Sequence, residues 1–237
     1  MLRILFNEPK RIDSGLLLEA GQAVRGYMQA LQQSSQKHSA AEPHKRHHRY
    51  KVWSQGFIDA LDELEESKYC CERFAQRISK LTVEAMNPAE QDDYHRFVYF
   101  YKNAFIRLFS ILDKLGTFLN DLFEVKTEKA KTRFSYFTVL RRMHEHHIHG
   151  PLENQLYNLK IDYKSALDRL RNQRNMEMHY INADMFDDLT QQEPKPAEPL
   201  HVENVKANIA DLQQGFDMVC RTLIVAFSYI TSLQAKE

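Results

Sequence analysis

The sequence predicts an all-α protein, a single helical domain over residues 1–237 built as an up-and-down bundle of five to six long helices. Glycine and proline, which interrupt regular structure, number only seven each, and average usage would give about twice as much glycine. Apolar residues recur at alternating steps of three and four, the period of amphipathic helices. Some of these patterns run for more than about 25 residues, which favours long helices joined by loops.

A polar connector separates the first two patterns. The first covers residues 14–33, with Ser14 placed to cap its N-terminus. Residues 35–49 are rich in His, Lys and Arg, and we expect them to form a flexible loop. The second pattern covers residues 50–86. A polar interval inside it leaves open whether it is one bent helix or two.

The third pattern is the clearest. Asn87 is expected to be the N-cap, Pro88 the first helical residue, and Glu90 the residue that closes a capping box. Gly116 lies inside this helix and should cost only about 1 kcal/mol relative to alanine. The apolar residues of one face are Phe97, Tyr101, Ala104, Leu108, Leu112, Leu115, Leu119 and Leu122.

The rest of the chain continues the helical series. A charged linker at 124–132 leads to a shorter helix over residues 134–147. A long helix is expected over 152–180 and the last one over 202–234. Between these two, residues 182–200 are acidic and contain three prolines, which predicts a flexible loop.

Composition narrows the function classes. The formal net charge is zero, so the chain as a whole has no electrostatic affinity for nucleic acid or anionic lipid. Three cysteines without a CxxC pair predict neither a disulfide framework nor a thiolate zinc site. The first ten residues are too short and polar for a secretory signal, and no stretch reaches about 18 uncharged apolar residues. We therefore expect a cytoplasmic protein without a membrane span.

Polar residues cluster near the end of the helix expected over 152–180. Steps of three and four place Asp168, Arg171, Asn175 and His179 on one helical face. Arg174 lies at the edge of that face, because five residues correspond to roughly 140° from His179 on an ideal helix. The two can serve one site through a long arginine side chain, a local distortion of the helix, or a site completed by a second chain.

These residue types suit metal-free cleavage of RNA by its neighbouring 2′-hydroxyl. Histidine titrates near neutral pH and can move a proton. A guanidinium can stabilise the charge of a phosphorane-like transition state, and an asparagine can orient either group. Arg171, Asp168 and Glu177 would support the site. The alternative is that Arg174 and His179 only form a polar network between helices.

The segment Arg174-Asn175-x-x-x-His179 resembles the R-(polar)-x-x-x-H motif of the HEPN superfamily (higher eukaryotes and prokaryotes nucleotide-binding). This resemblance implies an α-helical bundle, often a homodimer in which two motifs meet. It implies binding of RNA or a nucleotide and metal-independent endoribonuclease activity, with no cofactor. Arg174 and His179 would be catalytic, with Asn175 at the polar position. Because some members of the superfamily are not nucleases, a non-catalytic interaction or dimerisation module remains the alternative.

Two further features lie in the helix expected over 134–147. Arg141 and Arg142 could bind RNA phosphates if the basic segments converge near His179. His144 and His147 are one turn apart, but metal sites in helical bundles draw ligands from several helices, and we find no second set. We therefore expect a solvated, partly cationic helix end and no metal.

Overall fold

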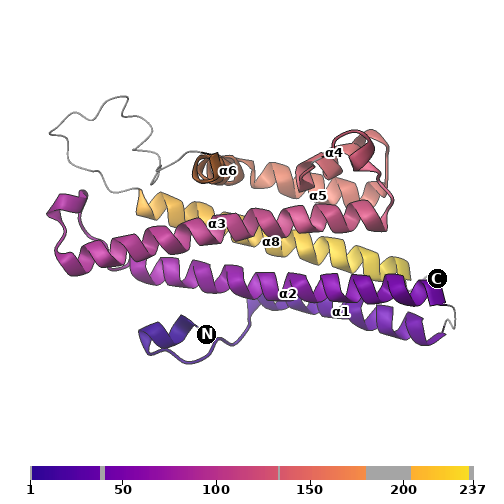
Figure 1. Cartoon of the computed structure of the whole chain (residues 1–237), viewed down its shortest axis with the longest axis horizontal. Helices are drawn as coiled ribbons and strands as arrows, with labels where there is room; N and C mark the ends of the chain where they lie inside the picture. The colour runs from indigo at the N-terminus through magenta and orange to yellow at the C-terminus, as the bar shows by residue number, and fades with distance from the viewer. Residues whose placement is uncertain (1, 38–40, 133, 180–203, 235–237) are drawn as a thin grey trace. The chain divides into compact units, whose positions relative to one another are not determined.

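The computed structural model describes the backbone of residues 2–37, 41–132, 134–179 and 204–234, with side chains except at 35–37, 41–45 and 178–179. This part of the chain is all-α, as predicted, and contains no β-strand. It has seven α-helices, one more than the largest number expected, and Figure 1 shows them in chain order. They are α1 (Gly15–Lys37), α2 (Ala41–Ala75), α3 (Pro88–Leu122), α4 (Tyr136–Glu145), α5 (Gly150–Asp162), α6 (Lys164–His179) and α8 (Val205–Gln234). Short 3-10 turns lie at Leu2–Phe6, Val83–Ala85 and Thr127–Lys129.

The predicted flexible loop at 35–49 is largely wrong. Helix α1 continues to Lys37 and α2 begins at Ala41, so most of the connector is helical. Pro43 lies in the first turn of α2, where a missing backbone N–H breaks no helical hydrogen bond. Charged residues alone did not distinguish a solvated helix from a loop. The second predicted loop, 182–200, lies outside the described residues.

The single helix predicted over 152–180 is two helices. Helix α5 ends at Asp162 and α6 begins at Lys164, whose first turn includes a bond from the backbone N–H of Leu167 to the carbonyl oxygen of Tyr163 (3.1 Å). No glycine or proline marks this break, and the apolar steps of three and four continue across it. Periodicity therefore could not predict the interruption.

The start of α3 is only partly as predicted. Asn87 is the N-cap, because its side-chain oxygen accepts the backbone N–H of Glu90 (2.9 Å). The Glu90 carboxylate does not return to Asn87, so the predicted capping box is wrong. It accepts the backbone N–H groups of Ser79 (2.5 Å) and Lys80 (2.9 Å) and the Ser79 hydroxyl (3.0 Å). The backbone bond from Ser79 is the main cause that lowers the pKa of Glu90.

The chain divides into two compact units, each assembled from separate stretches of sequence. Unit 1 comprises residues 1–11, 63–108 and 163–216, and unit 2 comprises residues 12–62, 109–162 and 217–237. Helix α6 belongs to unit 1, whereas α4 and α5 belong to unit 2 and lie side by side (Figure 1). The single domain expected from the sequence stays a prediction.

Aromatic residues form the core of unit 2. The ring of Phe118 lies 6.0 Å from Tyr27, 5.9 Å from Phe57 and 5.5 Å from Phe227, measured between centroids. These four side chains are almost fully buried. Trp53 lies at the edge of this cluster, with its ring 6.2 Å from Phe118. Edge-to-face and tilted contacts of this kind add to the free energy of apolar burial.

Gly116 has a larger role than the sequence predicted. A Cβ atom at this position would lie 2.7 Å from the Cα and 3.0 Å from the backbone nitrogen of Tyr136. That nitrogen donates a hydrogen bond to the carboxylate of Asp113 (3.0 Å), which joins the start of α4 to α3. The glycine therefore permits contact between two backbones within unit 2, and its expected small cost in the helix is outweighed by this packing.

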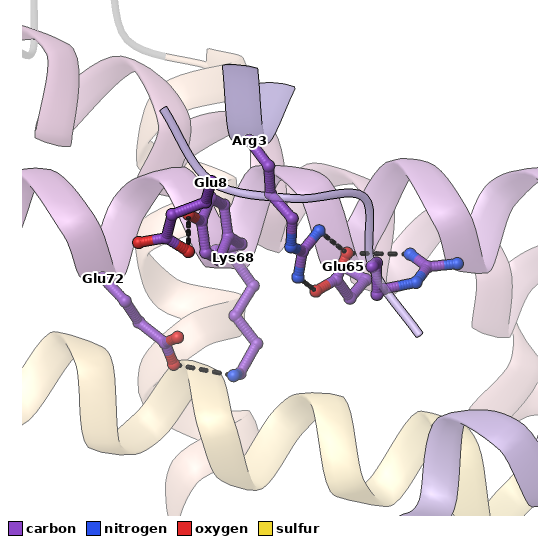
Figure 2. Close-up of polar contacts among 7 residues, drawn as sticks. Arg3, Glu8, Glu65, Lys68 and Glu72 are labelled. Atoms are coloured by element: carbon purple, nitrogen blue, oxygen red, sulfur yellow. Dashed lines mark hydrogen bonds and ion pairs between the residues drawn. The ribbon is translucent and has the colours of Figure 1, made fainter. Parts of the chain in front are cut away.

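An N-terminal clasp, defined as residues 3–11, holds the end of α2 within unit 1 (Figure 2). The guanidinium of Arg3 forms two bonds with the carboxylate of Glu65, and Arg11 adds a third at 2.8 Å. Glu8 accepts the hydroxyl of Tyr69 at 2.6 Å. Burial opposes ionisation of Glu65, but the two guanidinium groups outweigh it and lower the pKa of this carboxyl group.

Helix α8 is long and apolar enough to cross a membrane by length and composition alone. Its most apolar window of 18 residues has a mean hydropathy of 1.4, and half of that window is buried inside the structure. The core helix of a soluble protein passes the same test, so the feature is weak evidence for a span.

Candidate functional site

Helix α6 carries the motif found in the sequence, and its two halves differ in packing. Ala166, Leu167 and Leu170 in the first half are buried, and a Cβ on Gly215 of α8 would lie 2.9 Å from the Leu170 Cδ1 atom. None of residues 171–177 is buried. The half of the helix that carries the motif is therefore not anchored by buried apolar side chains among its described residues.

Arg174 and Asn175 contact each other at the start of the motif. An Nη2 hydrogen of Arg174 bonds to the side-chain oxygen of Asn175 at 3.1 Å, and both side chains are half-buried. This bond turns the side-chain oxygen of Asn175, the acceptor end of its amide, toward the guanidinium. A partly exposed guanidinium with an adjacent amide is a suitable donor set for a phosphate.

The structure describes the other residues of the predicted site to different extents. Asp168 and Arg171 lie one turn apart and form a loose ion pair of 3.8 Å, with half and about a third of their side-chain surface exposed. His179 is the last residue of α6, but its side chain lies outside the described residues. The expected meeting of His179 with Arg174 therefore stays a prediction.

Glu177 lies on a different side of α6 from that of Asn175. Its carboxylate pairs with the ammonium group of Lys102 on α3 at 2.9 Å. Positions 175 and 177 differ by about 200° around an ideal helix. Glu177 thus helps to hold α6 against α3, and its predicted supporting role in the site stays a prediction.

Sequence reasoning missed two strong contacts of α6. Arg169 forms a two-point ion pair with the buried carboxylate of Asp211 on α8, with both N–O distances 2.6 Å. This pairing raises the pKa of Arg169. Gln173 accepts the hydroxyl of Tyr101 (2.6 Å) and donates to the side-chain oxygen of Asn208 (3.2 Å).

A signal for these contacts was present in the sequence. Arg169, Gln173 and Glu177 are spaced four residues apart and so form one stripe along α6. We call these three residues the polar stripe. Their partners lie far away in the sequence, however, and no local pattern identifies them.

The basic residues of α4 belong to unit 2. Arg141 is exposed, and Arg142 donates from Nε to the carbonyl oxygen of Val125 (3.0 Å), which fixes its side chain near the end of α3. Their expected convergence with the motif stays a prediction. His144 meets Glu153 of α5 at 3.0 Å. Among the described residues, no three His, Cys, Asp or Glu side chains are grouped to hold a metal ion.

The cysteines are not placed for nucleophilic chemistry. Cys70, Cys71 and Cys220 are free thiols, and all three are buried. Burial raises the pKa of Cys70 to about 11 and also raises that of Cys71. Since the thiolate is the nucleophilic form, these two residues are unreactive near neutral pH.

Comparison with protein families identifies the fold. The family model described as Cthe2314-like HEPN (HEPN_Cthe2314) matches residues 53–231, from α2 to α8, and this range includes the whole Arg174–His179 motif. No curated protein and no solved structure matches the chain. Because the match spans more than half of the sequence, the chain belongs to the Cthe2314-like HEPN family of helical proteins.

Proposed function

We propose that this protein binds RNA and cleaves it without a metal ion, using Arg174, Asn175 and His179. The observation that carries this proposal is the position of the motif. It occupies the last turns of α6, inside the region matched by the HEPN family, and begins with a half-buried Arg174 bonded to Asn175 at 3.1 Å.

The chemistry is an attack of the RNA on itself. The 2′-oxygen forms a bond to phosphorus while the bond to the 5′-oxygen of the next nucleotide breaks. The imidazole of His179 takes the proton from the 2′-hydroxyl as a general base, and the leaving 5′-oxygen takes a proton from water or from a second histidine. The guanidinium of Arg174 stabilises the extra negative charge on the phosphorane-like transition state. The products are a 2′,3′-cyclic phosphate and a 5′-hydroxyl.

A second copy of the chain would complete the site. Arg174 and His179 are separated by roughly 140° around an ideal helix, so one straight helix aims them in different directions. In a homodimer, Arg174 of one chain and His179 of the other can reach the same phosphate. This argument and the HEPN membership favour a twofold arrangement of α6.

The test is an RNA cleavage assay in EDTA. The wild-type protein should convert a structured RNA into fragments that end in 2′,3′-cyclic phosphate. His179→Ala and Arg174→Ala should lower the rate by a factor of at least about 100, with little change in thermal stability. The matched controls are His95→Ala and Arg25→Ala, which remove exposed side chains of the same types and should retain full activity. Full activity in His179→Ala would remove the catalytic assignment.

A second candidate is a non-catalytic interaction module, favoured by two exposed apolar residues. Tyr99 and Ile106 lie two turns apart on α3 and have 61% and 36% of their surface exposed. Their spacing places them on one face of the helix, where a partner could cover them. Absence of RNA cleavage by the wild-type protein, together with self-association that Tyr99→Ser and Ile106→Ser abolish, would favour this candidate.

A further inference from the structure

We propose that Gln173 is the positioning residue of the motif: its side-chain amide joins α6 to α3 and α8 and so sets the direction in which Arg174 and Asn175 point. This inference rests on the proposed function and concerns a residue outside the motif. Gln173 immediately precedes Arg174, and its side chain bonds to one residue of each neighbouring helix.

The first argument is the lack of buried apolar side chains among the described residues in the half of α6 that carries the motif. Among the described side chains of α6, the last buried apolar residue is Leu170, and none of residues 171–177 is buried. The end of a helix frays easily when few buried side chains hold it. In this half of the polar stripe, Gln173 bonds to α3 and α8, and Glu177 pairs with Lys102 of α3.

The second argument is the geometry of the amide. Its oxygen accepts the hydroxyl of Tyr101, which is fully buried, across 2.6 Å. Its nitrogen donates to the side-chain oxygen of Asn208, which is 5% exposed. Both partners are fixed by burial, so the amide has one orientation that satisfies both bonds. Rotation of α6 about its axis would break them.

The third argument is that Gln173 lies closer to the motif than Arg169, the first residue of the polar stripe. Arg169 pairs with Asp211 one turn before Gln173, and that ion pair fixes the position of α6 but lies farther from the motif. Gln173 is adjacent to Arg174 in sequence, so a change in its backbone position moves the guanidinium directly. A misplacement of a catalytic group by about 1 Å can cost up to about 100-fold in rate.

The experiment compares four variants of the full chain. Gln173→Leu keeps the size of the side chain and removes both bonds, whereas Tyr101→Phe removes one of them. Gln173→Glu keeps the length of the side chain and the acceptor for Tyr101, so this conservative variant should retain the wild-type exchange and cleavage rates. Asn172→Ala is the matched control, because Asn172 is an exposed neighbour on α6.

Two readouts are needed. Amide hydrogen exchange after residue 173 of α6 should rise about tenfold in Gln173→Leu and stay unchanged over residues 166–170. In RNA cleavage, kcat should fall roughly 10- to 100-fold while KM stays within about twofold. Gln173→Glu and Asn172→Ala should behave like the wild-type protein in both readouts.

The outcomes separate this inference from the proposed function. Unchanged exchange in Gln173→Leu overturns the positioning role, whatever the enzyme assay shows. Raised exchange with unchanged kcat also overturns it, because the motif would then not depend on this anchor. If the wild-type protein does not cleave RNA, the proposed function fails, and the exchange result alone decides whether Gln173 anchors the end of α6.

Discussion

Gly116 and Tyr136 are in backbone contact: a Cβ atom on Gly116 would lie only 2.7 Å from the Cα atom of Tyr136. Gly116→Ala should therefore destabilise the protein by about 2 kcal/mol, because backbone atoms cannot move aside as a side chain can. Chemical denaturation followed by circular dichroism measures this loss. The control is Gly26→Ala in α1, where a Cβ atom meets nothing within 4 Å and should stabilise the helix by up to about 1 kcal/mol. Equal effects of the two substitutions would contradict the contact.

The hydroxyl group of Tyr27 is buried without a hydrogen-bond partner, and burial raises its pKa. Tyr27→Phe should leave the free energy of unfolding unchanged or increase it by about 1 kcal/mol, because no bond is lost and a desolvated polar group is removed. Tyr50→Phe is the comparison. Tyr50 donates to Asp121 (2.7 Å) and accepts from Arg46 (3.0 Å), so this variant should lose about 1 kcal/mol. A loss in Tyr27→Phe as large as in Tyr50→Phe would contradict this prediction.

The clasp should be sensitive to acid. The pKa of Glu65 is lowered in the folded state, so its contribution to stability is present above the unfolded value of 4.5 and is lost as the pH falls through the folded pKa. Glu65→Gln should cost about 2 kcal/mol at pH 7 and much less well below pH 4. Denaturation at several pH values checks this slope. A cost that is the same at neutral and acidic pH would show that the carboxylate charge does not matter.

His149 should produce a second pH dependence, at higher pH. Burial lowers the pKa of His149 below 6.5, so the unfolded chain takes up a proton before the folded chain does. Stability should therefore fall as the pH drops below 6.5. His149→Asn should flatten this part of the profile, and asparagine tolerates the left-handed backbone (φ 50°) at this position. His146→Asn, which removes an exposed imidazole three residues away, is the control.

Arg174 should not tolerate exchange for lysine. The flat guanidinium can bond to Asn175 and to two phosphate oxygens at once, and an ammonium group lacks this planar arrangement of donors. Arg174→Lys should therefore retain RNA binding and recover little of the cleavage rate lost in Arg174→Ala. Binding is measured by fluorescence anisotropy and cleavage by product analysis in EDTA. Recovery of the full rate would show that only the positive charge at position 174 is needed, and not the planar set of donors.

Features that depend on residues close together in the sequence were predictable. The N-cap at Asn87 depends on a side chain three residues from its partner, and the structure has it as predicted. The HEPN resemblance came from a six-residue motif, and the family match supports it. In both cases the deciding residues are close together in the sequence, so a pattern can reveal them.

Contacts between distant segments were not predictable. The role of Gly116 depends on Tyr136, twenty residues later, and its helical neighbours gave no sign of a close approach. Glu90 has the right spacing for a capping box, but Ser79 and Lys80 offer it backbone N–H groups instead. The polar stripe holds α6 through partners on α3 and α8 that lie far away in the sequence. The spatial relation of the His179 side chain to Arg174 lies outside the described residues and stays a prediction.

Trp53 is the only tryptophan of the chain, and it lies in unit 2 beside Tyr50 and Phe118, 6.2 Å from each ring. Its emission therefore monitors the melting of the aromatic cluster of unit 2. Helix α6 belongs to unit 1, so a variant with a loosened α6 needs a second measurement. Far-ultraviolet dichroism, which senses every helix, is the complementary optical assay.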